Sequence, residues 1–212
     1  MQPAAGSEAG RLDKAMEVPI DPHDHRRMTR DEVSVSEVCS WEGMIPRREE
    51  WNSLLADSAG DTLFLRHEWI GIWWHHFGAG RRLAVFLARQ GGRLVAALPL
   101  IEERGAVAGL PVRVLRSMTN AHAFRFNALA RPGAEHALAG IWAHLRHRSR
   151  TWDVIRLEEI PSDARVIDPL VAVAREDGAA VGIWHGGDVP YLPTEGTWEE
   201  YHASLSKNMR AN

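Results

Sequence analysis

Residues 83–101 read LAVFLARQGGRLVAALPLI, and this stretch decides the fold. Two apolar runs, residues 83–89 and 93–101, flank Gln90-Gly91-Gly92. Apolar runs of this length between turn residues are typical of strands. The two glycines permit the positive φ angles that a tight hairpin turn requires. The pattern therefore predicts an antiparallel hairpin, around which the other elements are arranged.

The elements expected on either side of this hairpin alternate between strands and helices. Before it we expect a strand near residues 33–39, a helix opened by Pro46, and a second helix over residues 67–77. After it we expect a strand that follows Gly109, a return to the sheet over 126–130, a helix over 132–148, a buried strand over 152–157, a helix over 164–176, a strand over 181–184, and a lead through 189–192 into a last helix. This order predicts a mixed α/β fold with a central, largely antiparallel sheet flanked by helices.

The bulk properties exclude several classes of protein. The hydrophobic fraction of 45% and the charged fraction of 25% are typical of a soluble globular chain. A net charge of −3 gives no support for a nucleic-acid partner, and the single Cys39 excludes an intramolecular disulfide. No apolar run approaches the roughly 18 residues that span a bilayer, and no signal peptide is recognisable. We therefore expect a cytoplasmic protein without a membrane partner, preceded by a disordered leader over residues 1–31.

The sequence contains only weak candidates for a general base or for metal ligands. The pairs Glu102-Glu103 and Glu158-Glu159 each follow an apolar strand, where a carboxylate can serve as a general base. Carboxylates at strand ends are more often simply solvated, and we prefer that interpretation. His144 and His147 share a helix face, but no third ligand lies nearby in the sequence. We expect no metal site, and no catalytic residue is assigned.

The best candidate for a functional surface is a long connection that reads SMTNAHAFRFN, residues 117–127. Polar and aromatic residues alternate in it, which is more typical of a loop than of a strand. Binding residues are often found on loops that a rigid scaffold holds in place. We predict that His122, Arg125 and Asn127 bind substrate.

The end of the chain begins a new element. Thr197 and Glu200 form a capping box, which marks the start of a helix. Four apolar residues then follow at helical spacing, so one face of this helix expects a partner: Trp198, Tyr201, Leu205 and Met209. No glycine cap, proline or return strand follows. Our interpretation is that the protein is cut short.

Three motifs, taken in order, resemble a known family. They are FLRHEWIGIWWHHFG at 64–78, GRLVAALPL at 92–100, and WEEY with LSKNMR between 198 and 210. Their order and spacing resemble the acetyltransferase family linked to cellulose and exopolysaccharide biosynthesis, the CelD type. That family belongs to the GNAT superfamily and is related to the FemAB-like peptidyl transferases. The resemblance covers about residues 33–212.

The resemblance implies a protein of two GNAT-like halves. Residues 32–188 would be the first half, and residues 189–212 the opening strand and helix of a truncated second half. Acetyl-CoA is expected to bind in the second half, so this chain is expected to be inactive alone. Its partner would be the missing C-terminal half or a second copy in a homodimer. The acceptor would be a sugar or a cell-envelope precursor, contacted by residues 122–127.

No acyl-CoA turn is recognised in the chain itself. In the family, a strand, an Arg/Gln-x-x-Gly-x-Gly/Ala turn and a helix hold the pyrophosphate with backbone N–H groups. The one match, residues 175–180, follows a helix instead, and we interpret Gly178 as the end of that helix. No cofactor-binding residue is assigned. The alternative hypothesis is a truncated or accessory module without enzymatic activity that pairs through its C-terminal helix.

Overall fold

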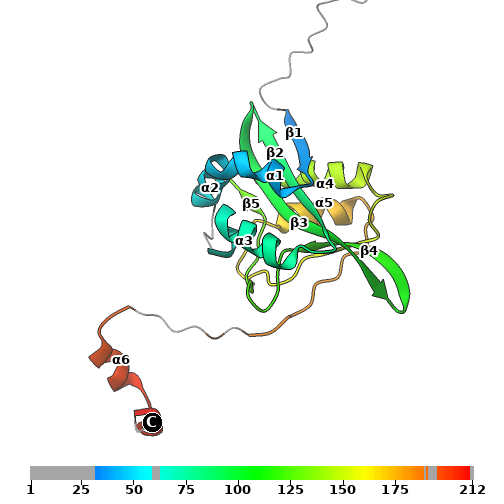
Figure 1. Cartoon of the computed structure of the whole chain (residues 1–212). Coiled ribbons are helices and arrows are strands. Elements are labelled where there is room, and N and C mark those ends of the chain that lie inside the picture. The colour runs from blue at the N-terminus through cyan, green and yellow to red at the C-terminus, as the bar shows by residue number, and fades with distance from the viewer. Residues whose placement is uncertain (1–31, 59–62, 189, 191–194, 211–212) are drawn as a thin grey trace, which may run out of the picture.

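The computed structural model describes residues 32–58, 63–188, 190 and 195–210. Its centre is the predicted hairpin, which is confirmed. Strands β2 (Arg82–Gln90) and β3 (Arg93–Val107) pair antiparallel (Figure 1). Gly91 and Gly92 join them at φ angles of 57° and 82°. Two consecutive positive φ angles make the tight turn whose twist matches that of the flanking strands.

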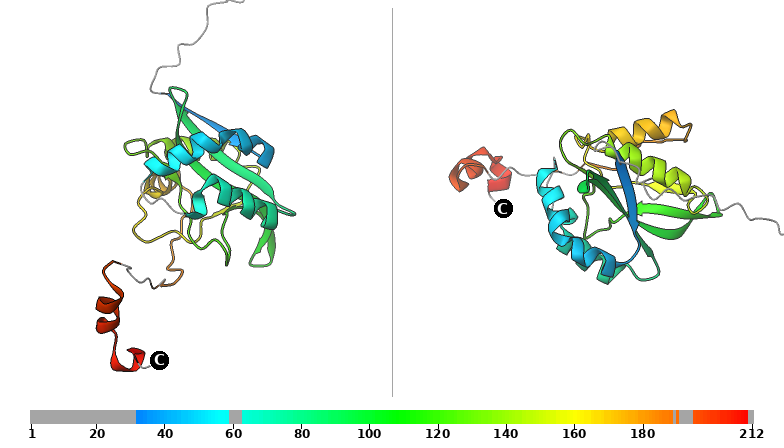
Figure 2. Two further views of the ribbon diagram at one scale, coloured as in Figure 1. Left: turned by 60° about the vertical axis from the view of Figure 1, so that its left-hand side comes forward. Right: turned by 90° about the horizontal axis from the view of Figure 1, so that it is seen from above.

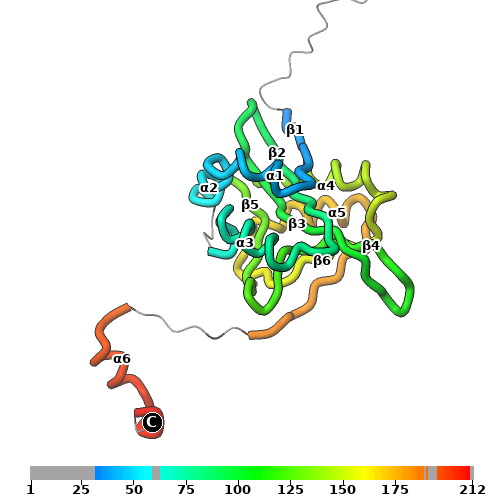
Figure 3. Tube along the Cα trace, viewed as in Figure 1, coloured from blue at the N-terminus to red at the C-terminus, as the bar shows by residue number. Residues whose placement is uncertain are grey.

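The remaining strands extend this hairpin on both sides. The sheet order is β1-β2-β3-β4-β6, and β5 pairs with β3. Strand β1 (Val33–Val38) pairs antiparallel with β2, and both β4 (Leu110–Ser117) and β5 (Leu129–Ala130) pair antiparallel with β3. Only β6 (Val154–Arg156) runs parallel to its neighbour, β4 (Figure 3). The predicted mixed α/β fold with a largely antiparallel sheet is confirmed.

Helices cover both faces of the sheet (Figure 2). On one face α4 (Ala137–His147) contacts β1, β2 and β3, and α5 (Asp168–Glu176) packs against α4. On the other face α2 (Arg48–Asp57) contacts β3, β5 and α3 (His67–Phe77). Short turns connect them: α1 (Trp41–Met44) and the 3₁₀ turns Ile45–Arg47 and Leu63–Leu65. Because both faces are covered, every residue from 83 to 88 and from 94 to 101 is buried.

The C-terminal segment forms two short helices, α6 (Trp198–Ser204) and α7 (Lys207–Arg210). The capping box is confirmed, because the Thr197 hydroxyl accepts from the Glu200 N–H and the Glu200 carboxylate accepts from the Thr197 N–H. The single helix expected here is wrong, since Leu205 is extended and separates the two. Neither helix has a buried residue. No helix in the described ranges combines the length and the apolar character needed to cross a bilayer.

Several predicted boundaries are wrong. The segment 181–184, predicted as a strand, pairs with nothing, and its Ile183 and Trp184 are 74% and 63% exposed. The helix expected from residue 132 starts at Ala137, because Gly133 (φ 82°) makes a turn first. The helix expected from residue 164 starts at Asp168, and the expected buried strand shrinks to the half-buried β6.

Parts of the predicted domain organisation remain predictions. The leader over residues 1–31 lies outside the described residues, as do residue 189 and residues 191–194. The division at 188/189 into two GNAT-like units stays a prediction.

The packing of α1 on α3 depends on Gly71, because glycine has no side chain there. The ring of Trp41 lies on Gly71, where a Cβ atom would come within 2.4 Å of Trp41 Cζ2. The same ring contacts the His67 ring, with 4.8 Å between centroids, and His67 Nε2 lies 2.9 Å from the Met44 carbonyl oxygen. The start of α3 therefore depends on an indole that only glycine at position 71 admits.

We expect Gly71→Ala to destabilise the protein by about 1–3 kcal/mol, the usual range for overpacking. In a Trp41→Ala background the same change should stabilise it by about 1 kcal/mol, because alanine is then simply the better helix former. Chemical denaturation of the four proteins of this double-mutant cycle measures both values. A stabilising Gly71→Ala in the presence of Trp41 would contradict the packing described.

An exposed ion pair holds β6 against β4. Both oxygens of the Asp153 carboxylate accept from the Arg113 guanidinium, at 2.8 and 3.0 Å, and one also accepts from the Arg113 backbone N–H at 2.8 Å. In return, the Asp153 N–H donates to the Arg113 carbonyl oxygen. The side-chain bonds from Arg113, followed by its backbone bond, lower the pKa of Asp153 to about 2.

Since this pKa is lower in the folded than in the unfolded chain, the pair stabilises the fold above the unfolded pKa of about 3.9 and is lost as the pH falls towards 2. Asp153→Asn should lower the free energy of unfolding at neutral pH. The difference from the wild type should shrink between about pH 4 and pH 2. Denaturation at several pH values measures it, and a difference independent of pH would contradict the ion pair.

Candidate functional site

The candidate site arises where the sheet is interrupted. Strand β4 pairs with β3 only as far as Leu100, and β5 resumes the pairing at Ala97. Between these contacts lie Leu98 and Pro99 of β3, which have no strand partner on that side within the described residues. Proline has no N–H for a ladder and is confined in sheets to edges and irregular positions. Residues 118–128 therefore leave the sheet at Ser117 and return at Leu129.

This excursion packs on an aromatic stripe of α3. Trp69, Trp73 and Phe77 lie four residues apart, which places them on one side of the helix. His122 stacks on Phe77 with 5.5 Å between ring centroids and 15° between planes. At the other end Phe124 contacts Phe64 at 4.9 Å, and Phe64 contacts Trp69 at 5.2 Å. The loop thus contacts the stripe directly at Phe77, and it reaches Trp69 through Phe64.

Hydrogen bonds fix both ends of the loop to the segment after β6. The Ser117 hydroxyl accepts from the Glu158 N–H at 3.0 Å, and the Phe126 N–H donates to the Glu159 carbonyl oxygen at 2.9 Å. At the tip, Asn120 and Ala123 exchange two backbone bonds. The Asn120 side chain also accepts from the His122 N–H at 2.9 Å. The loop is therefore a defined structure.

The predicted site residues take different places in this loop. His122 and Arg125 are exposed, whereas Asn127 is only 7% exposed. Asn127 Oδ1 is buried without a hydrogen-bond partner. Within the described part of the chain no hydrogen bond or ion pair joins the three residues to one another. Their role in binding substrate stays a prediction.

Sequence reasoning missed two further groups at this site. The indole nitrogens of Trp69 and Trp73 are buried without a hydrogen-bond partner, and Trp73 is only 3% exposed. Helix α3 thus holds two unmatched buried donors, and Asn127 in the loop holds one unmatched buried acceptor. Buried polar groups are nearly always paired, so these three atoms require an explanation. The aromatic spacing on α3 was the available signal, but it indicates only a packed face.

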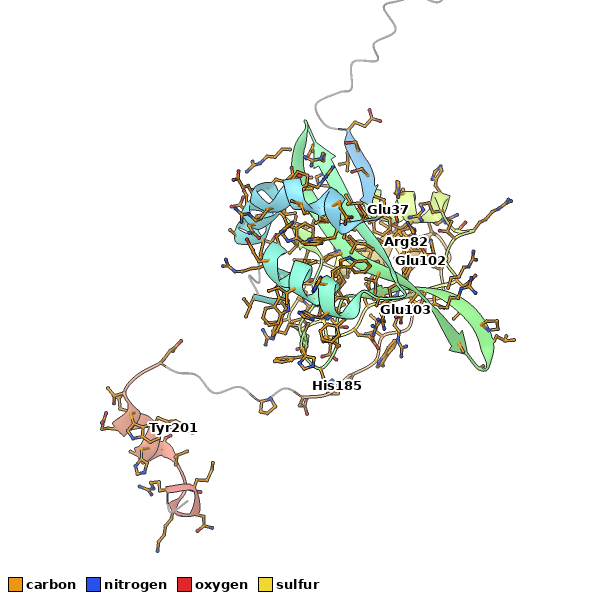
Figure 4. All side chains as sticks on the ribbon, in the orientation of Figure 1. Glu37, Arg82, Glu102, Glu103, His185 and Tyr201 are labelled. Atoms are coloured by element: carbon orange, nitrogen blue, oxygen red, sulfur yellow. The ribbon has the colours of Figure 1, made fainter. Side chains whose placement is uncertain are left out.

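Three of the four candidate carboxylates form ion pairs. Glu102 pairs with Arg82 at 2.5 Å, and Arg82 also lies 3.2 Å from Glu37 (Figure 4). Glu103 pairs with Arg81 at 2.7 Å and with Arg116 at 3.2 Å. Both carboxylates are therefore occupied by guanidinium groups.

Glu158 is held in the same way, at 3.6 Å from Arg116 and at 3.0 Å from Arg156. The preference for solvated carboxylates is corrected here, because the Glu102, Glu103 and Glu158 side chains are ion-paired.

The two histidines of α4, His144 and His147, have different surroundings. Burial lowers the pKa of His144, and His147 Nδ1 lies 3.1 Å from the Ala143 carbonyl oxygen of its own helix. No group of three or more His, Cys, Asp or Glu side chains that could hold a metal occurs among the described residues.

The residues present do not fit a phosphate-binding turn. Gly178 ends α5 with φ 78°, so its interpretation as a helix end is confirmed. Its N–H donates to the Arg175 carbonyl oxygen, and the Ala179 N–H donates to that of Ala174. These N–H groups are therefore unavailable to a pyrophosphate.

No protein-family model matches the chain, and no curated protein matches it. Several solved structures are similar to it at low identity. They include a ribosomal-protein-alanine N-acetyltransferase from Brucella melitensis biovar Abortus 2308, at 19% identity and a TM-score of 0.41, covering 76% of this chain and 100% of that one.

A possible acetyltransferase from Clostridium difficile 630 has 7% identity and a TM-score of 0.44 and covers 76% of this chain and 99% of that one. A transcriptional regulator from Bacillus halodurans C-125 has 13% identity and a TM-score of 0.45, with coverages of 76% and 100%. Because these TM-scores lie below 0.5, we rest no conclusion about fold or function on them.

The anchoring of the loop can be tested at Ser117, which is fully buried. Ser117→Ala leaves the Glu158 N–H without its acceptor, so we expect a loss of about 1–3 kcal/mol of stability and faster hydrogen exchange at Glu158. Ser36→Ala, at an exposed position of β1, is the matched control and should stay within about 0.5 kcal/mol of the wild type. Equal effects of the two changes would show that the bond does not anchor the loop.

Proposed function

We propose that this chain is the N-terminal portion of an acyl-CoA-dependent N- or O-acetyltransferase of the GNAT type. Its acceptor would be a sugar or a precursor of a cell-surface polysaccharide. The proposal is supported by the sequence resemblance to the CelD-type family and by the mixed sheet with helices on both faces. The observation that carries the choice of acceptor is the loop of residues 118–128, with its unmatched polar atoms over an aromatic stripe.

A sugar matches the chemistry of that surface. A hydroxyl group donates and accepts at once, so sugar hydroxyls can donate to Asn127 Oδ1 and accept from the indole nitrogens of Trp69 and Trp73. Ligand sites commonly combine aromatic walls with a few polar groups that fix orientation. His122 and Arg125, exposed at the loop surface, would contact the part of the acceptor that remains outside. Because these three atoms are buried, a local movement would accompany binding.

The acyl-CoA would be held elsewhere in the complete enzyme. In the described residues the one candidate turn has its N–H groups already bonded within the chain. This half would therefore bind and orient the acceptor, whose amine or hydroxyl receives the acyl group. We expect no binding of acetyl-CoA or free CoA to the purified chain by calorimetry. Micromolar binding would contradict this division of roles.

Acceptor binding is tested with cellotetraose, followed by tryptophan fluorescence or calorimetry. We expect Asn127→Leu to weaken binding about 5- to 30-fold, the usual effect of one lost hydrogen bond of about 1–2 kcal/mol. It should not lower the free energy of unfolding, because the amide oxygen it removes has no partner in the protein. His122→Ala and Arg125→Ala should also weaken binding.

The matched control is Asn208→Leu, at an exposed position of α7, which should leave the affinity unchanged. Cellotetraose affinity that is the same in the wild type, Asn127→Leu and Arg125→Ala would contradict the acceptor site. Failure of the folded wild type to bind the sugar would do the same.

A second candidate function is supported by the C-terminal helices. Trp198 and Met209 are exposed, and α6 starts with a complete capping box although it buries no residue. An exposed apolar helix face is typical of an interaction surface, so the chain would act as a pairing module without enzymatic activity. Gel filtration of the full chain and of Trp198→Ser distinguishes the two. A monomer in both cases would contradict pairing through this helix.

A further inference from the structure

The strands β3 and β4 continue beyond the sheet as a two-stranded ribbon. Strand β2 begins at Arg82, opposite Glu102, and β6 pairs with β4 only at residues 114–116. Within the described chain, residues 103–113 therefore have no strand neighbours except each other, and the ribbon projects from the body of the molecule (Figure 1). A projecting ribbon presents its tip to whatever lies beside the protein.

The tip of this ribbon is apolar. Residues 105–112 read GAVAGLPV, without a single polar side chain. Val107 and Leu110 are 53% and 69% exposed at the turn. No residue from 105 to 112 is buried. An apolar stretch at the most exposed point of a fold marks a contact with an apolar partner.

The turn itself places an apolar residue where it is unfavourable. Ala108 has φ 49° and Gly109 has φ 80°, a pair of positive angles for which Asn-Gly or Asp-Gly is the usual choice. Alanine in the left-handed region is strained, and Asn or Gly would remove that strain. An apolar residue at this strained position suggests that the apolar character of the tip is more important than the stability of the turn.

Two arginines lie behind the apolar tip. Arg104 and Arg113 are directly opposite each other on the ribbon, and like charges in that arrangement are destabilising. Asp153 compensates Arg113, whereas Arg104 is exposed and has no ion pair within the described residues. Arg104 therefore carries a positive charge that no described side chain matches.

A groove beside the base of the ribbon includes the same arginines. Its volume is about 620 Å³, and its charged lining is Arg81, Arg82, Arg104, Arg113, Glu102 and Glu103. Both glutamates are paired, with Arg81 and Arg82, and Asp153 pairs with Arg113. Arg104 is therefore the groove arginine that no ion pair among the described residues matches.

We propose that this ribbon docks on a lipid surface that carries anionic headgroups. The apolar tip enters the interface, and Arg104, which has no ion pair among the described residues, contacts the headgroup phosphates. Val107 lies three positions after Arg104, which is about 10 Å along a strand. Apolar elements that lie in the interface are buried by about 5–10 Å, so Arg104 reaches the level of the phosphates. The sequence predicted no membrane partner because no segment can span a bilayer, and docking of this kind requires none.

The test is co-sedimentation of the full chain with vesicles of phosphatidylcholine, with or without about 30% phosphatidylglycerol as the anionic lipid. We expect binding to the anionic vesicles alone, weakened by salt. Arg104→Gln should lower the partition constant about 5-fold, the value of about 1 kcal/mol per arginine near such a surface. Val107→Ser with Leu110→Ser should lower it at least about 10-fold.

Matched controls lie elsewhere on the surface. Arg175→Gln on α5 and Ile72→Ser on α3 remove the same kinds of exposed side chain and should leave the partition constant unchanged. Ala108→Gly and Ala108→Asn should both stabilise the fold by relieving the turn. Only Ala108→Asn should weaken vesicle binding, because only asparagine adds a polar group to the tip.

Three results would overturn the proposal. The first is no binding to anionic vesicles by a folded wild-type chain. The second is equal loss of binding in the ribbon variants and in the controls. The third is a dimer in sedimentation velocity, without lipid, that Leu110→Ser dissociates, since this would assign the tip to a second copy of the chain.

Discussion

The whole structure depends on the pairing of β2 with β3. Strand β1 pairs with β2, β4 and β5 pair with β3, and β6 reaches the sheet only through β4. The Gly91–Gly92 turn fixes the register of the central pair, and a slip by one residue would exchange its two faces. Because both faces are buried under helices, each strand must be apolar on both sides, and residues 83–88 and 94–101 meet that demand.

The candidate site is a local exception to this regularity. At Pro99 the ladder on one side of β3 has no strand, and the chain uses the gap to send residues 118–128 across α3. The surrounding arginine–glutamate pairs remove most carboxylates from consideration as bases. What remains at the loop is a set of unmatched hydrogen-bonding atoms, which suits recognition of a ligand better than proton transfer.

The sequence predicted the parts of the fold that local signals determine. The helix α3, the strand β2 and the start of β3 have the expected bounds within one residue, because glycine turns and aromatic periodicity suffice to define them. Strand β3 runs six residues past its expected end at residue 101, to Val107. The prediction of a strand over residues 181–184 was wrong, because a strand requires a neighbouring strand to pair with, and this segment has none among the described residues. At the loop, polar composition identified His122, Arg125 and Asn127. Which of them is buried depends on packing against segments that are distant in the sequence, such as Phe77 of α3, and local sequence patterns do not contain that information.

The two proposed surfaces lie at the two ends of one strand. Strand β4 begins at Leu110 in the ribbon tip and ends at Ser117, where the loop starts. Seven residues of strand span about 24 Å. If the tip rests at the boundary of the acyl chains and β4 stands perpendicular to the membrane, the loop lies well outside the headgroups. An acceptor bound there would have to extend from the lipid by several sugar units, or be free in solution. A short lipid-linked sugar could not reach it, so the geometry favours an oligosaccharide acceptor over a monosaccharide attached directly to a lipid.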